Sequence, residues 1–186
     1  MLECRIALRE EEQTAILHQR YCIFVEEFNF FAPRNDGRQI EYDEYDKYSL
    51  LLGVWNKDIL VASCRLVLPN NTLGLPTLNA MIIDSEKLQD DQSTAEISRI
   101  TVSSPHRTFK KTIKVLQLMQ NKIDQISSDH KIIQLIGAVE PSFMRLLNCA
   151  SLPYQPIGPL QYLIGAERFP VLLKVQDYTH SMKENQ

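Results

Sequence analysis

Cysteine and histidine are scarce in this chain, at four each among 186 residues, and neither is spaced for metal binding. The sequence contains no CxxC, HxxxH or HxH pair, and spacings of this kind are what zinc sites usually show. We therefore expect no metal and no bound cofactor.

Long hydrophobic runs and an excess of positive charge are also missing. Residues 1–12 lack the apolar core of a signal peptide, and no later run approaches the ~20 apolar residues of a membrane span. The formal net charge of -3 disfavours a nucleic-acid partner, because such binding rests on phosphate contacts. We expect a cytoplasmic protein with no membrane span and no nucleic-acid partner.

Glycine-rich phosphate loops are absent too, since neither GxGxxG nor GxxxxGK[ST] occurs, so dinucleotide and P-loop functions have no support. What remains is an ordinary globular composition, with 44% hydrophobic and 23% charged residues. The length suits one domain over residues 1–186, and the pattern predicts a frayed tail over 176–186.

Hydrophobic periodicity and turn residues predict a mixed order of helices and strands. We expect strands over 4–8, 48–55, 59–68, 96–102 and 132–139, helices over 10–28, 108–127 and 142–147, a long loop over 29–47, an irregular segment over 70–94, and two short strands within 154–175. This order predicts an α/β (α+β) sandwich with a mixed central sheet flanked by helices, and not a doubly wound nucleotide-binding fold.

The strand predicted over 96–102 is the most informative segment, because it combines a carboxylate, a hydroxyl and a guanidinium with an apolar pattern. Buried charges are costly unless they are paired, so they need a reason. Strict alternation would put Glu96, Ser98, Ile100 and Val102 on one face and Ile97, Arg99 and Thr101 on the other. Two interpretations stay open: a structural ion-pair network, or a polar active-site cleft between strands.

Several motifs occur in the order and spacing of a known group of enzymes. They are Arg20, Phe24, the acidic run 41–46, Arg65 and 96–99, followed by 139–147 and 154–159. Together they resemble the N-acyl amino acid synthases, including the exosortase-associated acyltransferases, and the related acyl-homoserine lactone (autoinducer) synthases. The resemblance covers residues 15–175. It implies a GNAT-like acyl-CoA N-acyltransferase fold.

Two departures from these families bear on the substrates. Acyl-homoserine lactone synthases have a tryptophan shortly after the first helix, where this chain has Phe30-Phe31-Ala32. The segment 106–111 contains no glycine, so close approach of its backbone to a pyrophosphate is harder. This favours an acyl carrier protein over coenzyme A as the acyl donor. A basic group would suit that acidic partner or be an ordinary helix face: Arg107, Lys110, Lys111 and Lys114.

The resemblance and the residue types together suggest roles for individual side chains. Glu96 is the candidate to accept the amine proton, and Ser98 to hydrogen-bond donor or acceptor. The acidic loop would be clamped by ion pairs, with Asp43 and Asp46 facing Arg65 and Arg99. The substrate-binding set is Arg20, Phe24, Phe28, Phe31, Ile100 and Val102. For Glu96 the alternative is a structural pair with Arg65 or Arg20, and for the phenylalanines simple packing.

The predicted activity is transfer of a long-chain fatty acyl group from acyl carrier protein to the amine of an amino acid or similar small molecule. One alternative is an acyl-homoserine lactone synthase that uses S-adenosylmethionine. Another is a catalytically silent acyl-binding or regulatory module with the same fold. Met119, Ile123 and Ile126 either border an acyl tunnel or pack in the core.

Overall fold

A mixed β-sheet forms the centre of the molecule, and its strands follow the order β1-β2-β3-β4-β5-β8-β6, with β7 paired to β8. The computed structural model describes residues 1–89 and 91–176, so the tail predicted from 176 lies, from residue 177 on, outside the described residues. The strands are β1 (Leu2–Ile6), β2 (Ser49–Asn56), β3 (Ile59–Val67), β4 (Thr94–Val102), β5 (Gln134–Val139), β6 (Gln155–Pro156), β7 (Gln161–Leu163) and β8 (Ala166–Lys174). Only β4 and β5 run parallel among these paired neighbours of the described chain.

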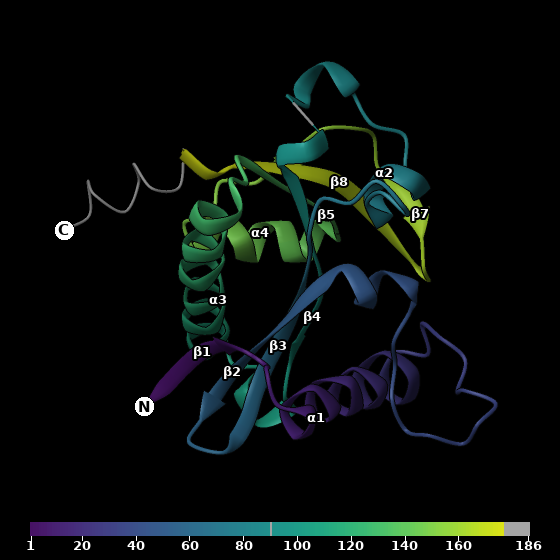
Figure 1. Ribbon diagram of the computed structural model, residues 1–186, viewed down its shortest axis with the longest axis vertical. Coiled ribbons are helices and arrows are strands. Elements are labelled where there is room, and N and C mark those ends of the chain that lie inside the picture. Colours follow the sequence, from purple (N-terminus) through teal and green to yellow (C-terminus); the bar gives the residue numbers. More distant parts are fainter. Residues whose placement is uncertain (90, 177–186) are drawn as a thin grey trace.

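Helices cover both faces of the sheet (Figure 1). They are α1 (Glu10–Arg20), α2 (Pro76–Ala80), α3 (Phe109–His130) and α4 (Pro141–Cys149). Helix α1 packs against β2, β3 and β4, whereas α3 packs against β1, β2 and β3 from the other side. The predicted mixed sheet flanked by helices is therefore confirmed.

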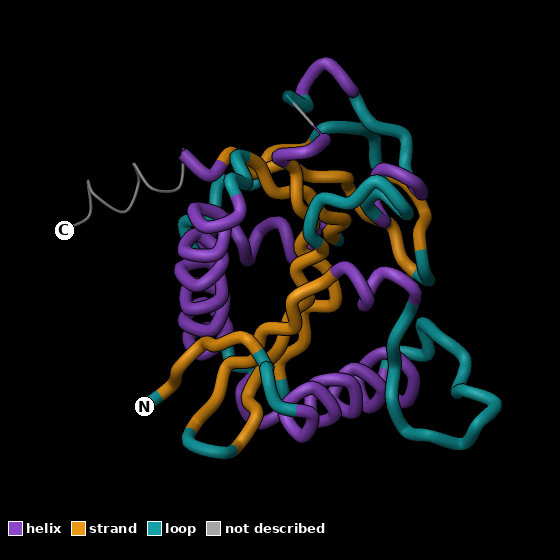
Figure 2. Tube along the Cα trace, viewed as in Figure 1, coloured by secondary structure: helices purple, strands orange, loops and turns teal. Residues whose placement is uncertain are grey.

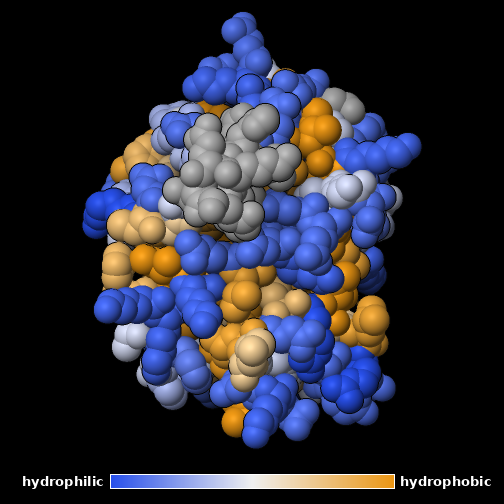
Figure 3. Space-filling view, turned by 90° about the vertical axis from the view of Figure 1, so that its left-hand side faces the viewer, coloured by the Kyte–Doolittle hydropathy of each residue, from blue (hydrophilic) through white to orange (hydrophobic). Residues whose placement is uncertain are grey.

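Helix α3 shows why the sequence folds in this way. Its buried residues recur at three- and four-residue steps and include Leu116, Met119 and Ile123, which join the main core under the sheet. Lys131 ends the helix in the left-handed conformation at φ 56°. The face of the molecule on this side is largely hydrophilic, with smaller hydrophobic groups between the polar side chains (Figure 3).

Three segments differ from the sequence prediction. Within 154–175 the chain forms three strands, β6, β7 and the nine-residue β8, and not two short ones. The helix predicted over 10–28 is α-helical only to Arg20 and continues as a π-helix over Tyr21–Glu27, in which the Phe28 amide donates to the Ile23 carbonyl oxygen at 3.0 Å. Such wider turns are rare, and hydrophobic periodicity does not reveal them. The irregular segment 70–94 contains helix α2, whose only sequence signal is Pro76 at its first position.

The acidic segment returns to the sheet after a long excursion. Residues 28–43 form no regular helix or strand and appear as the long loop at the lower right of Figure 2. A short 3-10 helix, Glu44–Tyr48, then leads directly into β2. Asp43 caps this helix, since its carboxylate accepts from the Tyr45 amide at 2.9 Å and its own amide donates to Asp46 at 2.8 Å. The loop therefore delivers its carboxylates to the sheet in a fixed conformation.

Strands β4 and β5 pair over only three positions and then part. The ladder joins Thr94 to Gln134, Ala95 to Leu135 and Glu96 to Ile136. A side chain at Gly137 would place its Cβ 2.8 Å from the Ile97 carbonyl oxygen, so only glycine fits where the strands separate. Beyond this point the two strands border open space.

Candidate active site

A cavity of about 910 Å³ opens where β4 and β5 part. Its walls come from both strands, from the π-helix and the loop after it, from α2 and α4, and from the β7–β8 hairpin. Its lining combines charged side chains with a group of phenylalanines and isoleucines. A pocket of this kind, apolar with a few converging polar groups, suits a small organic substrate.

A β-bulge in β4 decides which residues face the polar part of the cavity. The register with β3 shifts between Ser63 and Arg65, and Arg99 lies in the left-handed region at φ 53°. Ser98 and Arg99 are consecutive, yet both bond to the same group of side chains: Ser98 Oγ accepts from Arg65, and Arg99 donates to Asp43. The strict alternation predicted for this strand is therefore wrong.

The bulge also moves the hydrophobic residues of β4. Ile100 was expected on the same face as Glu96 and Ser98, but it borders a smaller pocket beside Leu116 and Met119 of α3. Val102 belongs to the core beneath that helix. Both residues nevertheless line the large cavity as well. Strand β4 thus contributes polar side chains to the large cavity and apolar side chains to both the large cavity and the smaller pocket.

Three arginines and three carboxylates form a buried ion-pair network beside the cavity. Arg20 Nε donates to Glu41 at 2.6 Å, and its Nη1 and Nη2 donate to the two oxygens of Asp46 at 2.7 and 3.1 Å. Arg65 Nη1 donates to Asp43 at 2.5 Å and to Asp46 at 3.1 Å. Arg99 donates to Glu41 at 3.1 Å and to Asp43 at 2.9 Å. Each guanidinium thus bridges two carboxylates, and the formal charges of this set cancel.

The network perturbs the proton affinity of its members. Burial by itself would raise the pKa of Asp46, but the bonds from Arg20 and the charge of Arg65 hold that pKa below its ordinary value. Burial lowers the pKa of Arg99, partly opposed by Glu41. The predicted pairing of Arg99 with Asp43 is present, and Glu41 is a further member that the sequence-based set of site residues lacked.

Glu96 is buried next to this network, with 2% of its surface exposed. Its oxygens accept from the Thr77 amide at 2.7 Å and from the Thr77 hydroxyl at 2.9 Å. Burial raises its pKa to about 7, against the opposing effect of the two Thr77 bonds. The structural alternative, a direct ion pair with Arg65 or Arg20, is wrong, because both arginines bond to other carboxylates.

An aromatic wall of Phe24, Phe28, Phe30 and Phe31 faces the charged side of the cavity. The Phe28 and Phe30 rings stack with centroids 5.3 Å apart, and the Phe24 and Phe31 rings meet edge to face at 6.3 Å. The Arg99 guanidinium lies 4.5 Å from the centroid of Phe31. Through Arg99, the ion-pair network is therefore in direct contact with the aromatic wall.

The basic group at the start of α3 is divided. Arg107 lines the cavity, but both its terminal nitrogens bond to Glu27 and its Nε donates to the Val102 carbonyl oxygen at 2.6 Å. The three lysines of this group, Lys110, Lys111 and Lys114, are exposed and lie outside the cavity lining. The Arg107 guanidinium is therefore already occupied. The lysines are exposed, although Lys111 Nζ donates to the Pro105 carbonyl oxygen at 3.1 Å.

The cavity brings together most of the residues singled out from the sequence. Those that line it are Phe24, Phe28, Phe31, Asp43, Arg65, Glu96, Ser98, Arg99, Ile100, Val102 and Arg107. Arg20 does not line the cavity, against expectation, because its guanidinium is turned into the ion-pair network and is 1% exposed. Asp46 lies behind Asp43 in the same network.

Sequence reasoning missed the residues that loops and short helices bring to the cavity. Tyr45, Thr77 and Asn79 line its polar side, and Asn79 donates to the Tyr45 hydroxyl at 3.0 Å. Phe143 and Arg168 line the cavity as well. Tyr45 lies inside the acidic run and Phe143 inside a motif already noted, so both had a signal. Thr77 had only the neighbouring Pro76.

In residues 1–89 and 91–176 no group of three or more histidine, cysteine or acidic side chains is arranged to hold a metal ion. Among the helices of the same residues, none combines the length and apolar character needed to cross a bilayer. The side chains that line the cavity include carboxylates, guanidinium groups and hydroxyls.

Comparison with known proteins agrees with this geometry. The family model described as Acetyltransferase (GNAT) domain matches residues 19–117, which include β4 and the start of α3. The chain belongs to this acetyltransferase family. It is accordingly an acyltransferase with a GNAT fold, as the sequence resemblance implied. No curated protein matches this GNAT chain in sequence.

Solved structures with the same fold include two acyl-homoserine lactone synthases and an N-acyl amino acid synthase. BjaI, a CoA-dependent acyl-homoserine lactone synthase solved with MTA, has TM-score 0.75 and 20% identity over 100% of this chain and 88% of its own. FeeM, an N-acyl amino acid synthase from uncultured soil microbes, has TM-score 0.73 and 14% identity over 97% and 94%. LasI, an AHL synthase, has TM-score 0.73 and 11% identity over 94% and 90%. At these identities the likeness establishes the fold.

The ion-pair network yields a stability prediction. Asp46→Asn removes the carboxylate that pairs with both Arg20 and Arg65, and leaves buried guanidinium groups without full compensation. We expect the free energy of unfolding, measured by urea denaturation at pH 7, to fall by about 3–5 kcal/mol. Because the pKa of Asp46 is depressed, this contribution exists above its ordinary pKa and is lost as pH falls.

A matched control is Asp36→Asn, since Asp36 also bridges two arginines, Arg34 and Arg38, but at the exposed surface. This control should leave the unfolding free energy nearly unchanged. Equal losses in the two variants would contradict a special role for the buried network.

Proposed function

We propose that the protein is an N-acyltransferase that moves a fatty acyl group from the thioester of an acyl carrier protein to the amine of an amino acid or a similar small molecule. The observation that carries the proposal is the parting of β4 and β5 into a cavity lined by both charged and apolar side chains. A thioester lying in this gap would have its acyl chain against isoleucine and phenylalanine and its carbonyl carbon near Glu96, Ser98 and Arg99. No nucleophilic side chain is needed for this reaction.

The reaction requires an uncharged amine, stabilisation of a tetrahedral oxyanion, and a leaving thiolate. The amine nitrogen attacks the thioester carbonyl carbon, and the carbon–sulfur bond then breaks. A thiol has a reference pKa of about 8.5, so the thiolate leaves without strong help from an acid. Peptide N–H groups near the end of the β4–β5 ladder are suited to the oxyanion, because fixed donors in a cavity cost no reorganisation during reaction.

Glu96 is the group we assign to accept the proton released by the amine, directly or through a water molecule. It lines the cavity, and a carboxylate with a pKa of about 7 is matched to proton transfer near neutral pH. Ser98 lies two residues further along β4 and is oriented by the bond from Arg65 Nε at 3.0 Å. Its hydroxyl proton is available to the donor or the acceptor.

The acceptor is best accommodated between the ion-pair network and the aromatic wall. Arg65 lines the cavity, and its buried Nη2 has no hydrogen-bond partner among the described residues, which leaves one donor unsatisfied next to the proposed acceptor site. Phe24 and Phe31 provide an apolar surface beside Arg99. Phe28, Ile100 and Val102 line the part we assign to the acyl donor. Asp43, Asp46, Arg65 and Arg99 act as the clamp that holds the acidic loop over the site.

The exposed lysines support a carrier protein as the donor. Lys110, Lys111 and Lys114 lie beside the cavity-lining Arg107, and none of them is used to line the cavity itself. An acidic carrier protein would pair with them, and its phosphopantetheine arm would enter the gap between the strands. BjaI, by contrast, is CoA-dependent, so coenzyme A is the donor to test against it.

The decisive experiment offers the purified protein one acyl group on two donors, acyl carrier protein and coenzyme A, with a pool of amino acids and, separately, S-adenosylmethionine. We expect N-acyl amino acids by mass spectrometry, formed faster from the carrier protein. Acyl-homoserine lactone formed from S-adenosylmethionine would show the protein to be an autoinducer synthase instead. Tight donor binding without any product would indicate a catalytically silent binding module.

Charge reversal at the lysines tests the donor separately. Lys110→Glu with Lys111→Glu should lower kcat/KM for acyl carrier protein about tenfold or more at low salt, because electrostatic steering controls encounter. The same variant should use an acyl-pantetheine thioester as well as the wild type does, since this donor has no protein surface. An equal loss with both donors would contradict carrier-protein docking at this face.

The raised pKa of Glu96 predicts a pH dependence. Below pH 7 Glu96 is protonated and cannot accept a proton, so kcat should rise with pH through about 7. Because the folded pKa is above the ordinary value, the stability contributed by protonated Glu96 is lost over the same rise in pH. Glu96→Gln should lower kcat about 100-fold or more at pH 8 and remove this step from the profile.

Thr77→Val is the control for this assignment. It removes the hydroxyl that donates to Glu96 and leaves the backbone donor in place. The pKa of Glu96 should rise further, so the midpoint of the kcat profile should move to higher pH. If the midpoint stays unchanged in Thr77→Val and the step persists in Glu96→Gln, another group accepts the proton.

A further inference from the structure

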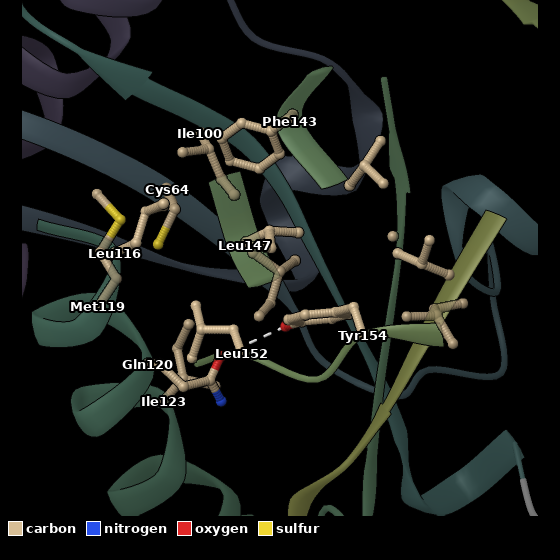
Figure 4. A pocket seen from close by; sticks show the side chains of 15 residues that line it. Cys64, Ile100, Leu116, Met119, Gln120, Ile123, Phe143, Leu147, Leu152 and Tyr154 are labelled. Atoms are coloured by element: carbon tan, nitrogen blue, oxygen red, sulfur yellow. Dashed lines mark hydrogen bonds between the residues drawn. The ribbon is translucent and has the colours of Figure 1, made fainter. Parts of the chain in front are cut away.

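A second, smaller pocket of about 30 Å³ lies behind the main cavity, between the sheet and helices α3 and α4. Four residues border both spaces, and they are Ile97, Ile100, Val139 and Phe143. Figure 4 shows Ile100 and Phe143 close together at one end of this inner pocket. The inner pocket therefore adjoins the main cavity near the point where β4 and β5 separate, with these four side chains between the two spaces.

The inner pocket is apolar except at its far end. Leu116, Met119, Leu147 and Leu152 are among the side chains that form its walls. Gln120 of α3 and Tyr154, which follows α4, lie on the opposite side from Phe143 (Figure 4). A buried amide and phenol in such surroundings are costly unless they are hydrogen-bonded.

These two side chains are bonded to each other and anchored from outside the pocket. The Tyr154 hydroxyl donates a long hydrogen bond to Gln120 Oε1 at 3.4 Å, and Gln120 Nε2 donates to Asp124 Oδ1 at 3.0 Å. Gln120 is 2% exposed and Tyr154 is 6% exposed, so water cannot easily replace either bond. Asp124, one helical turn beyond Gln120, holds the amide in place.

We propose that Gln120 and Tyr154 form the end wall of the acyl-binding pocket and set the longest acyl chain that the protein transfers efficiently. The proposal rests on the proposed function and adds the residues that select the acyl group. An acyl chain that extends from the strand gap between Ile100 and Phe143 meets this pair at the far end of the pocket.

Two physical constraints make the pair a selective barrier. The inner pocket has a volume of about 30 Å³, close to the share of a single water molecule in the liquid, so it admits only the end of a chain. Met119 can adjust its shape to a ligand, but a longer chain must separate Tyr154 from Gln120 and leave both polar groups against methylene groups. A chain that extends past the limit therefore meets an added cost that a purely apolar wall would not impose.

The test compares chain-length profiles in the whole protein. The variant combines Gln120→Ala with Tyr154→Phe, which removes the polar pair and creates space. The probes are acyl-pantetheine thioesters from butanoyl to hexadecanoyl. For each we measure kcat/KM with the best amine acceptor and, independently of activity, the rise in melting temperature on binding. Donors just beyond the wild-type limit should gain about tenfold in kcat/KM relative to shorter ones.

Ile126→Ala is the matched control, because Ile126 is a buried residue of the same helix that does not line the inner pocket. It should lose stability without any change in the chain-length profile. If the double variant keeps the wild-type profile in both measurements, the end-wall assignment is overturned.

The binding measurement separates this inference from the proposed function. Length-dependent stabilisation that shifts in the double variant supports the end wall even if no N-acyl product forms with any amine. Product formation with a profile that the double variant leaves unchanged supports the transferase and overturns the end wall.

Discussion

The buried pairing of three arginines with three carboxylates is the constraint on which the polar half of the site depends. Its members come from α1, from the acidic loop and its 3-10 helix, from β3 and from β4, so four separate parts of the chain meet at one place. A buried guanidinium is stable only while its partners remain, and this ties each segment to the others. The loop over 28–43 has no regular structure of its own, and the network gives its end a fixed position.

The same network accounts for the unusual backbone of β4. Arg99 takes a left-handed conformation, which is uncommon for a residue with a side chain and is found where other interactions compensate for it. With this bulge Arg99 reaches Glu41 and Asp43, while Ile97 and Ile100 border the inner pocket on the α3 side. A regular strand would have turned Arg99 away from Ser98. The bulge thus lets one strand serve both a polar reaction centre and an apolar binding space.

The site also depends on a gap between neighbouring strands. Three paired positions hold β4 and β5 together, and Gly137 permits their close approach just before they diverge. Glu96 is the last residue of β4 that pairs with β5. The ionisable group therefore lies at the open end of the β4–β5 ladder. The cavity, its polar edge and the inner pocket all begin at this point. In the proposed reaction the strand gap holds the thioester, the polar residues hold the acceptor, and the inner pocket holds the end of the acyl chain.

Much of the architecture could be read from the sequence because it is a matter of local pattern. Apolar residues of α3 recur at helical spacing, β2 and β3 are joined by a short polar turn, and the order of elements predicts a mixed sheet. The charged residues of 96–99 stood out because such groups rarely occupy a strand without partners, and those of 41–46 stood out as an acidic cluster in a loop. The presence of both acidic and basic residues in these segments also predicted that ion pairs would clamp the acidic loop.

Local pattern could not reveal features that depend on contacts between distant segments. The π-helical turn after Arg20 and the bulge at Arg99 both interrupt the regular periodicity of their elements. The bond of Thr77 to Glu96 joins two segments that are separate in sequence. Sequence therefore determined which charges and hydrophobic groups are present and in which elements they lie. Tertiary structure decided which of them meet, because a single bulge or a wider helical turn redirects side chains without changing the composition of the segment.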